Sequence, residues 1–188
     1  MPKIRESIPA VEATKLLRED HAKIKALFSE FEKSENDVMR KKIAGKALVE
    51  LEMHAQLEEE LFYPAFRKQL GEESLIDEAE EEHHVVKLLA RELAGMAPDH
   101  GRYEAKFTVM AEAVKRHIEE EESDVLPRFE QSGHDLEELG RRMMERKEQL
   151  MEQISGPEYL LEQGTGLKAK RPSGARKHGG RRTRGKRK

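Results

Sequence analysis

The chain has 188 residues, enough for one domain of about 150 residues and an appendage but not for two full cores. Charged residues make up 39% of it and hydrophobic residues 36%, and Trp is absent, which is typical of amphipathic helices with solvated outer faces. The lack of Cys excludes disulfides, thiolate zinc sites and iron–sulfur clusters ligated by this chain, so a metal would have to be held by imidazole and carboxylate groups.

A helical period in the apolar residues predicts the elements in chain order. Five segments are expected to be helical: residues 10–31, 37–71, 74–97, 103–133 and 135–154. Pro64 and Pro127 fall inside the second and fourth segments and are expected to bend them or to end their regular part.

Helices of this length with short connections are typical of an antiparallel four-helix bundle, with the fifth helix packed along its side. We therefore expect an all-α protein in which residues 1–154 form the bundle and residues 155–188 form a disordered basic tail. No apolar run approaches the roughly 20 residues of a membrane span, and the first residues lack the apolar stretch of a secretory signal. A cytoplasmic protein without membrane contact is the expectation.

The chain also repeats internally. The stretch HAQLEEELFYPAF, which begins at His54, aligns with HIEEEESDVLPRF, which begins at His117. Upstream, DHAKIKALF begins at Asp20 and aligns with EHHVVKLLA, which begins at Glu82. The bundle is thus predicted to consist of two related helical hairpins, each with a His on its first helix and a His-x-x-x-Glu pair on its second.

These polar residues interrupt apolar helix faces. Residues four apart share a face, so each His-x-x-x-Glu pair presents an imidazole and a carboxylate in one direction. A lone His there is more often a hydrogen-bonded core residue, but four of them on four helices, with two carboxylates that need a positive partner, favour a metal site. Six residues are the candidate ligands: His21, His54, Glu58, His83, His117 and Glu121.

Imidazole and carboxylate ligands without sulfur suit iron, manganese or zinc. Six ligands are too many for one ion that must keep an open position. If both Glu residues bridge, each of two ions receives two His and two carboxylate oxygens. An open dinuclear centre of this kind suits oxygen or peroxide as a ligand.

The third helix offers two adjacent histidines. His83 lies on the apolar face, whereas the face of His84 carries charged residues, so we favour His83. The 33-residue spacing from His21 to His54 would instead be repeated from His84 to His117. Glu59 and Tyr63 could contact the site, with a solvated or core role almost as consistent. Three further histidines are expected to be exposed: His100, His134 and His178.

Taken together, these motifs resemble the hemerythrin-like family, also called the HHE cation-binding domain. The match covers about residues 10–130, with DH, H-x-x-x-EE before YP, EH, and H-x-x-x-EE before LP on successive helices. The resemblance implies a bundle around a non-haem pair of iron ions, oxo- or hydroxo-bridged, with ligand roles for the six candidates. Ferritin-like bundles use Glu-x-x-His on two helices, a spacing found here on the third helix alone.

One position departs from the oxygen-carrying members of that family. They have a fifth His four residues after the His of the third helix, where this chain has Lys87. The resemblance therefore points away from oxygen storage. It indicates a protein that reacts with oxygen or peroxide, with catalase-like or peroxide-reducing turnover as its enzymatic form, or a protein that senses iron or redox state without turnover.

The tail suggests another class of function. The net charge of −3 conceals a division: residues 155–188 hold 11 Lys and Arg against two acidic residues, while residues 1–154 hold 24 basic and 36 acidic ones. Such a run binds phosphate backbones without sequence preference, so residues 168–188 are a candidate contact for nucleic acid beside a merely structural metal site. A solubilising end or a contact with the acidic body would explain it too.

Overall fold

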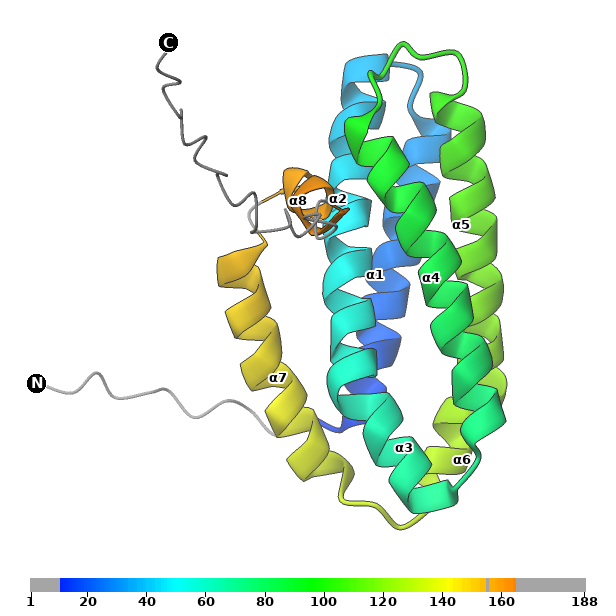
Figure 1. Cartoon of the computed structure of the whole chain (residues 1–188), viewed down its shortest axis with the longest axis vertical. Coiled ribbons are helices and arrows are strands. Elements are labelled where there is room, and N and C mark those ends of the chain that lie inside the picture. Colours follow the sequence, from blue (N-terminus) through cyan, green and yellow to red (C-terminus); the bar gives the residue numbers. More distant parts are fainter. Residues whose placement is uncertain (1–10, 155, 165–188) are drawn as a thin grey trace, which may run out of the picture.

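Four long helices form the body of the molecule (Figure 1). The computed structural model describes residues 11–154 and 156–164, in which every regular element is a helix. The four are α1 (Ala13–Lys33), α2 (Asp37–Leu57), α4 (Glu73–Gly95) and α5 (Tyr103–Glu120). None of the helices in these ranges combines the length and apolarity of a membrane span.

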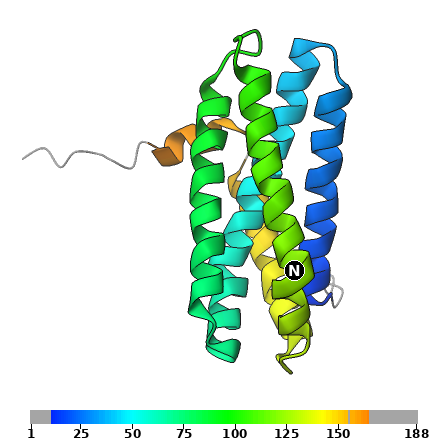
Figure 2. The ribbon, with the colours of Figure 1, turned by 90° about the vertical axis from the view of Figure 1, so that its right-hand side faces the viewer.

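The long helices pair as two antiparallel hairpins. Three residues join α1 to α2 and seven join α4 to α5, so each pair reverses direction at a short connection. The hairpins then pack on each other, α2 against α4 and α1 against α5, which closes the bundle seen from the side in Figure 2. The predicted all-α four-helix bundle is confirmed.

The second helix of each hairpin continues through a wider, π-helical turn. The additional elements are η1 (Glu58–Phe62) and α3 (Tyr63–Leu70) after α2, and η2 (Glu121–Val125) and α6 (Leu126–Glu130) after α5. The backbone N–H of Tyr63 bonds to the carbonyl of Glu58, five residues earlier. This wider turn gives room to the ring of Pro64, which would crowd the carbonyl four residues before it in a regular α-helix. The same turn precedes Pro127, so both helices run on past their prolines.

Two apolar clusters fill the bundle, and a polar layer separates them along each helix. His21 lies between Leu17, in one cluster, and Ile24, in the other. His117 likewise lies between Val114 and Val125. Many of the largest side chains in both clusters are aromatic. They are Phe28, Phe31 and Phe107 in one cluster and Phe62, Phe66 and Phe129 in the other. The inward face of each long helix is therefore apolar towards both ends of the bundle and polar in the layer between the two clusters.

The fifth predicted helix is α7 (Leu136–Gln153), which packs along α1 and α2 (Figure 1). Asp135 caps it, since its carboxylate accepts a hydrogen bond of 2.9 Å from the backbone N–H of Glu138. Gly140 allows the close approach of the backbone: a Cβ there would lie 1.8 Å from the carbonyl oxygen of Val11. α7 thus packs closely on the segment just before α1 as well as on the bundle.

The packed structure extends beyond the predicted boundary at residue 154. A short helix, α8 (Glu158–Gly164), lies in the segment assigned above to the tail, and its Leu160 is buried in the core cluster. α8 contacts α4. Seven residues are too few to show a helical period, so only tertiary burial reveals this helix. The rest of the expected tail, residues 155 and 165–188, lies outside the described residues, as do residues 1–10, the last of which is where the first helix was expected to begin.

Candidate metal centre

All six predicted ligands meet in the polar layer between the two apolar clusters. None exposes more than 6% of its surface. Each of the four long helices supplies one His, and each π-helical turn begins with one Glu: His21 from α1, His54 from α2, His83 from α4, His117 from α5, Glu58 from η1 and Glu121 from η2. His84, the alternative on α4, is exposed.

The four imidazoles form two pairs. The Nε2 atoms of His21 and His54 lie 3.1 Å apart, and those of His83 and His117 are also 3.1 Å apart. Two nitrogens held about 2.1 Å from one ion at a right angle would be separated by about 3.0 Å. Each pair therefore has the spacing of two ligands to a common ion.

The two glutamates connect these pairs. Glu58 Oε2 lies 3.2 Å from Nε2 of His54 and 3.3 Å from Nε2 of His83. On the other side of the layer, Glu121 Oε2 lies 3.2 Å from Nε2 of His21 and 3.5 Å from that of His117. Each carboxylate thus contacts one imidazole of each pair, as a bridging ligand would.

The protein's own hydrogen bonds leave this layer unsatisfied. Among the described residues, both carboxylate oxygens of Glu58 and Oε2 of Glu121 are buried without a hydrogen-bond partner. Buried carboxylates in this condition are costly. Two groups of ligand atoms lie close enough to hold an ion each: His21, His54, Glu58 and Glu121, and Glu58, His83 and His117. A pair of cations fits the donor set.

The ionisation of the glutamates points the same way. Burial raises the pKa of Glu58 well above its ordinary value, and the charge on Glu121 raises it further. Burial also raises the pKa of Glu121, but His117 and His21 outweigh it and hold that pKa below its ordinary value. Burial lowers the pKa of His54 well below its ordinary value, which favours the neutral imidazole that ligates metals. The pKa values of the two glutamates are thus moved in opposite directions, as expected for two neighbouring buried carboxylates.

Comparison with known proteins agrees with this geometry. The model of the hemerythrin HHE cation binding domain matches residues 12–129, which include all six candidate ligands. The chain belongs to the hemerythrin HHE family. Within this family, the crystal structure of an HHE domain-containing protein from Mycobacterium kansasii is 27% identical in sequence and has a TM-score of 0.67. The alignment covers 81% of this chain and 98% of that one.

Two curated relatives are also similar. A DNA nickase from Nostoc sp. is 26% identical over 146 residues, and an uncharacterized hemerythrin-like protein from Schizosaccharomyces pombe is 25% identical over 122 residues. These alignments cover 75% and 64% of this chain, but 40% and 60% of the two relatives. The chain thus spans less than two thirds of the length of either.

Three of the four imidazoles of this HHE centre are held from outside by carboxylates. Their Nδ1 atoms contact carboxylate oxygens as follows: His21 with Glu122 at 3.0 Å, His83 with Glu59 at 2.9 Å and His117 with Glu82 at 2.9 Å. An Nδ1–H that donates to a carboxylate fixes the tautomer in which Nε2 is a free ligand, and it raises the basicity of that nitrogen. The sequence suggested Glu59, and the repeat could have added its equivalent, Glu122.

A cation binds each of these outer carboxylates in turn. Lys87 Nζ lies 2.6 Å from both oxygens of Glu59, whose pKa burial raises but His83 and Lys87 together hold below its ordinary value. The corresponding partners are Lys25 for Glu122, at 3.3 Å, and Arg116 for Glu82, at 2.8 Å. Lys87, which occupies the position of the fifth His of the oxygen carriers, thus acts on His83 through Glu59.

Tyr63 contacts the centre directly. Of the roles that the sequence left open for it, contact with the site is the one observed. Its hydroxyl donates a hydrogen bond of 2.9 Å to Oε1 of Glu121 and lies 3.5 Å from Nε2 of His83. Burial, together with the charges of Glu121 and Glu58, raises the pKa of Tyr63 well above its ordinary value. The phenol is therefore a neutral donor that holds one oxygen of Glu121 in place.

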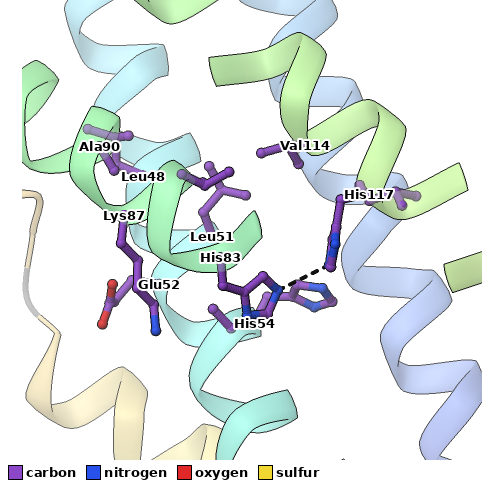
Figure 3. A pocket seen from close by; sticks show the side chains of 12 residues that line it. Leu48, Leu51, Glu52, His54, His83, Lys87, Ala90, Val114 and His117 are labelled. Carbon is purple, nitrogen blue, oxygen red and sulfur yellow. Dashed lines mark hydrogen bonds between the residues drawn. The ribbon is translucent and has the colours of Figure 1, made fainter. Parts of the chain in front are cut away.

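A narrow cavity adjoins three of the imidazoles (Figure 3). The space open to the centre of a water-sized sphere is about 30 Å³, which suffices for one or two waters or a diatomic molecule. Its walls are mainly apolar: Leu48, Leu51, Ala55, Val86, Ala90, Val114 and Ile118, with Glu52 and Lys87 as the charged residues beside His54, His83 and His117. A cavity of this volume has room for small molecules only.

Proposed function

We propose that this chain is a non-haem di-iron protein that binds or reacts with oxygen or peroxide. The observation that carries the proposal is the connection of two imidazole pairs by two glutamates, each of which contacts both pairs. A dinuclear centre accounts for this arrangement, whereas a core of unrelated buried histidines gives no reason for it. The sulfur-free donor set suits iron, zinc or manganese, and the resemblance to hemerythrin-like proteins is the reason for proposing iron among them.

The ligand roles follow from the contacts. His21 and His54 would hold one ion, His83 and His117 the other, and Glu58 and Glu121 would lie between both. Two bound iron ions would supply the electrons that oxygen or peroxide takes up, or accept them from peroxide.

The remaining residues prepare the site. The outer carboxylates orient the imidazoles, and Tyr63 holds Glu121 by its hydroxyl. Apolar walls limit the water that reaches the centre and admit molecules of the size of oxygen or peroxide. Lys87 stands where the oxygen carriers have a fifth His, so the ion at His83 would have one imidazole fewer than in those proteins. This difference supports reaction or sensing over storage.

Peroxide consumption tests the proposal. The full chain from iron-sufficient cells is expected to show the near-ultraviolet charge-transfer bands of a bridged di-iron centre and to decompose or reduce peroxide. Glu58→Ala and Glu121→Ala should lose both properties, while Glu60→Ala, on the exposed side of η1, should keep them. An iron-dependent change in melting temperature without turnover would instead identify a sensor.

A second candidate function involves nucleic acid. The relative from Nostoc sp. is named a DNA nickase, and residues 168–188 form a basic run outside the described residues. Binding of this run to DNA would release counterions, so the affinity would fall steeply as salt rises. Deletion of residues 168–188 should abolish such binding and leave the iron centre intact. Binding that survives the deletion would refute a role for the tail.

A further inference from the structure

One imidazole of the centre differs from the other three. The Nδ1 atom of His54 is buried and has no hydrogen-bond partner in the described part of the chain, whereas those of the other three histidines each contact a carboxylate. At the ion position between His83 and His117, both imidazoles therefore have a carboxylate at Nδ1. At the ion position between His21 and His54, only His21 has one.

The internal repeat identifies the residue that should have supported His54. Glu82 directly precedes His83 on α4 and reaches Nδ1 of His117 on the next long helix. Asp20 is the repeat equivalent of Glu82, and it directly precedes His21 on α1. By the same geometry it should reach His54 on α2. Its side chain is one methylene shorter than that of Glu82.

Asp20 instead forms an ion pair with Lys147 of α7. The contact is well shielded, since the side chains of Asp20 and Lys147 expose 8% and 16% of their surfaces. The repeat explains why the cation comes from α7. Arg116 binds Glu82, and its repeat equivalent is Met53, which carries no charge. Met53 is buried in the apolar cluster that also contains residues of α7. Lys147 lies outside residues 12–129, the part matched by the family model.

We propose, on the basis of the di-metal function above, that Lys147 is a positioning residue of the metal centre. By holding Asp20 it leaves His54 without an anionic acceptor, so the ion position of His21 and His54 binds its metal more weakly than the position of His83 and His117. The fifth helix thereby makes the two positions inequivalent. Loss of an acceptor behind a ligating His typically lowers metal affinity about 10- to 100-fold.

A cobalt titration tests this inference. The full chain, freed of metal by chelation, is titrated with Co²⁺ in competition with a chelator, and binding is followed by the visible absorption of the ion. Two steps are expected, separated by about 10- to 100-fold in affinity. In the double variant Asp20→Glu, Lys147→Met the carboxylate is longer and free of the lysine, so it can support His54 as Glu82 supports His117. The weaker step should then tighten by about 10-fold or more.

Three further variants separate this role from a general effect on α7. Lys147→Arg keeps a cation on Asp20 and should preserve two separate steps. Arg141→Met removes a cation of the same helix whose ion pairs, with Glu138 and Glu145, are exposed and internal to α7; it should also preserve both steps. Glu82→Ala deprives His117 of its acceptor, so the tighter step should weaken towards the other.

The outcomes divide cleanly. Two ions bound with equal affinity by the unaltered chain would overturn the inference while leaving the di-metal function intact. Unchanged steps in the double variant would do the same, and if that variant does not fold, unchanged steps in Glu82→Ala decide against it. Fewer than two ions per chain would overturn the proposed function and this inference with it.

Discussion

Replacement of Tyr63 by Phe removes one hydroxyl from the buried centre and leaves the aromatic ring in place. The hydroxyl donates to Oε1 of Glu121, whose pKa burial raises but His117 and His21 together hold below its ordinary value. Tyr63 has no exposed surface, so no bulk solvent takes over the hydrogen bond. A hydrogen bond to a charged group contributes about 1.5 to 3 kcal/mol net, and we expect Tyr63→Phe to lower the free energy of unfolding by that amount. For a domain of this size the melting temperature should fall by about 3 to 12 °C.

Tyr103 provides the matched control. Its hydroxyl is also buried, but it has no hydrogen-bond partner among the described residues. Tyr103→Phe removes an unsatisfied polar group, so it should leave stability unchanged or raise it slightly. Urea denaturation of the metal-free chain measures both variants. Two results would refute the reasoning: a Tyr63→Phe variant whose stability lies within about 0.5 kcal/mol of that of the unaltered chain, or equal losses of stability in both variants. Either result would show that Glu121 does not depend on the hydroxyl of Tyr63.

Three further predictions concern the metal and the outer helices. Removal of iron by a chelator should lower the free energy of unfolding by about 3 to 4 kcal/mol for each ion lost, at metal concentrations 100 to 1,000 times its dissociation constant; calorimetry checks this, and an unchanged melting temperature would contradict it. Gly140→Ala should destabilise the chain, because overpacking against the carbonyl of Val11 costs about 1 to 3 kcal/mol and more than the gain in helix propensity. Gly101→Ala, with open space around it, should be nearly neutral in the same thermal melt. Leu160→Ala should cost about 2 to 5 kcal/mol if α8 belongs to the core, and no loss would show that it does not.

The sequence predicted those parts of the centre that helix geometry alone determines. The His-x-x-x-Glu spacing places Glu58 beside His54 on one face, and the repeat requires the same of the second hairpin. The apolar face of α4 distinguished His83 from His84, and the structure buries the former and exposes the latter. Spacing between helices was a poorer guide, because the connection from α4 to α5 is four residues longer than that from α1 to α2, while His117 lies three residues nearer the start of its helix than His54 does, and the interval becomes 34 residues instead of 33.

Contacts between distant segments could not be predicted in this way. Glu82 looks like a solvated residue of a charged helix face, and only packing brings it to the imidazole of His117. Asp20 meets Lys147 across 127 residues of sequence, and no local pattern indicates this contact. The π-helical turns were anticipated only as irregularities at Pro64 and Pro127, because a bend, an end and a wider turn all relieve the same crowding.

Iron content per chain tests the central claim most directly, when it is measured side by side in the unaltered protein, His83→Ala and His84→Ala. The account predicts two irons in the unaltered chain, two in His84→Ala and fewer than two in His83→Ala, because only His83 lies in the buried centre. Zinc or no metal in the unaltered protein, or two irons retained by His83→Ala, would contradict it.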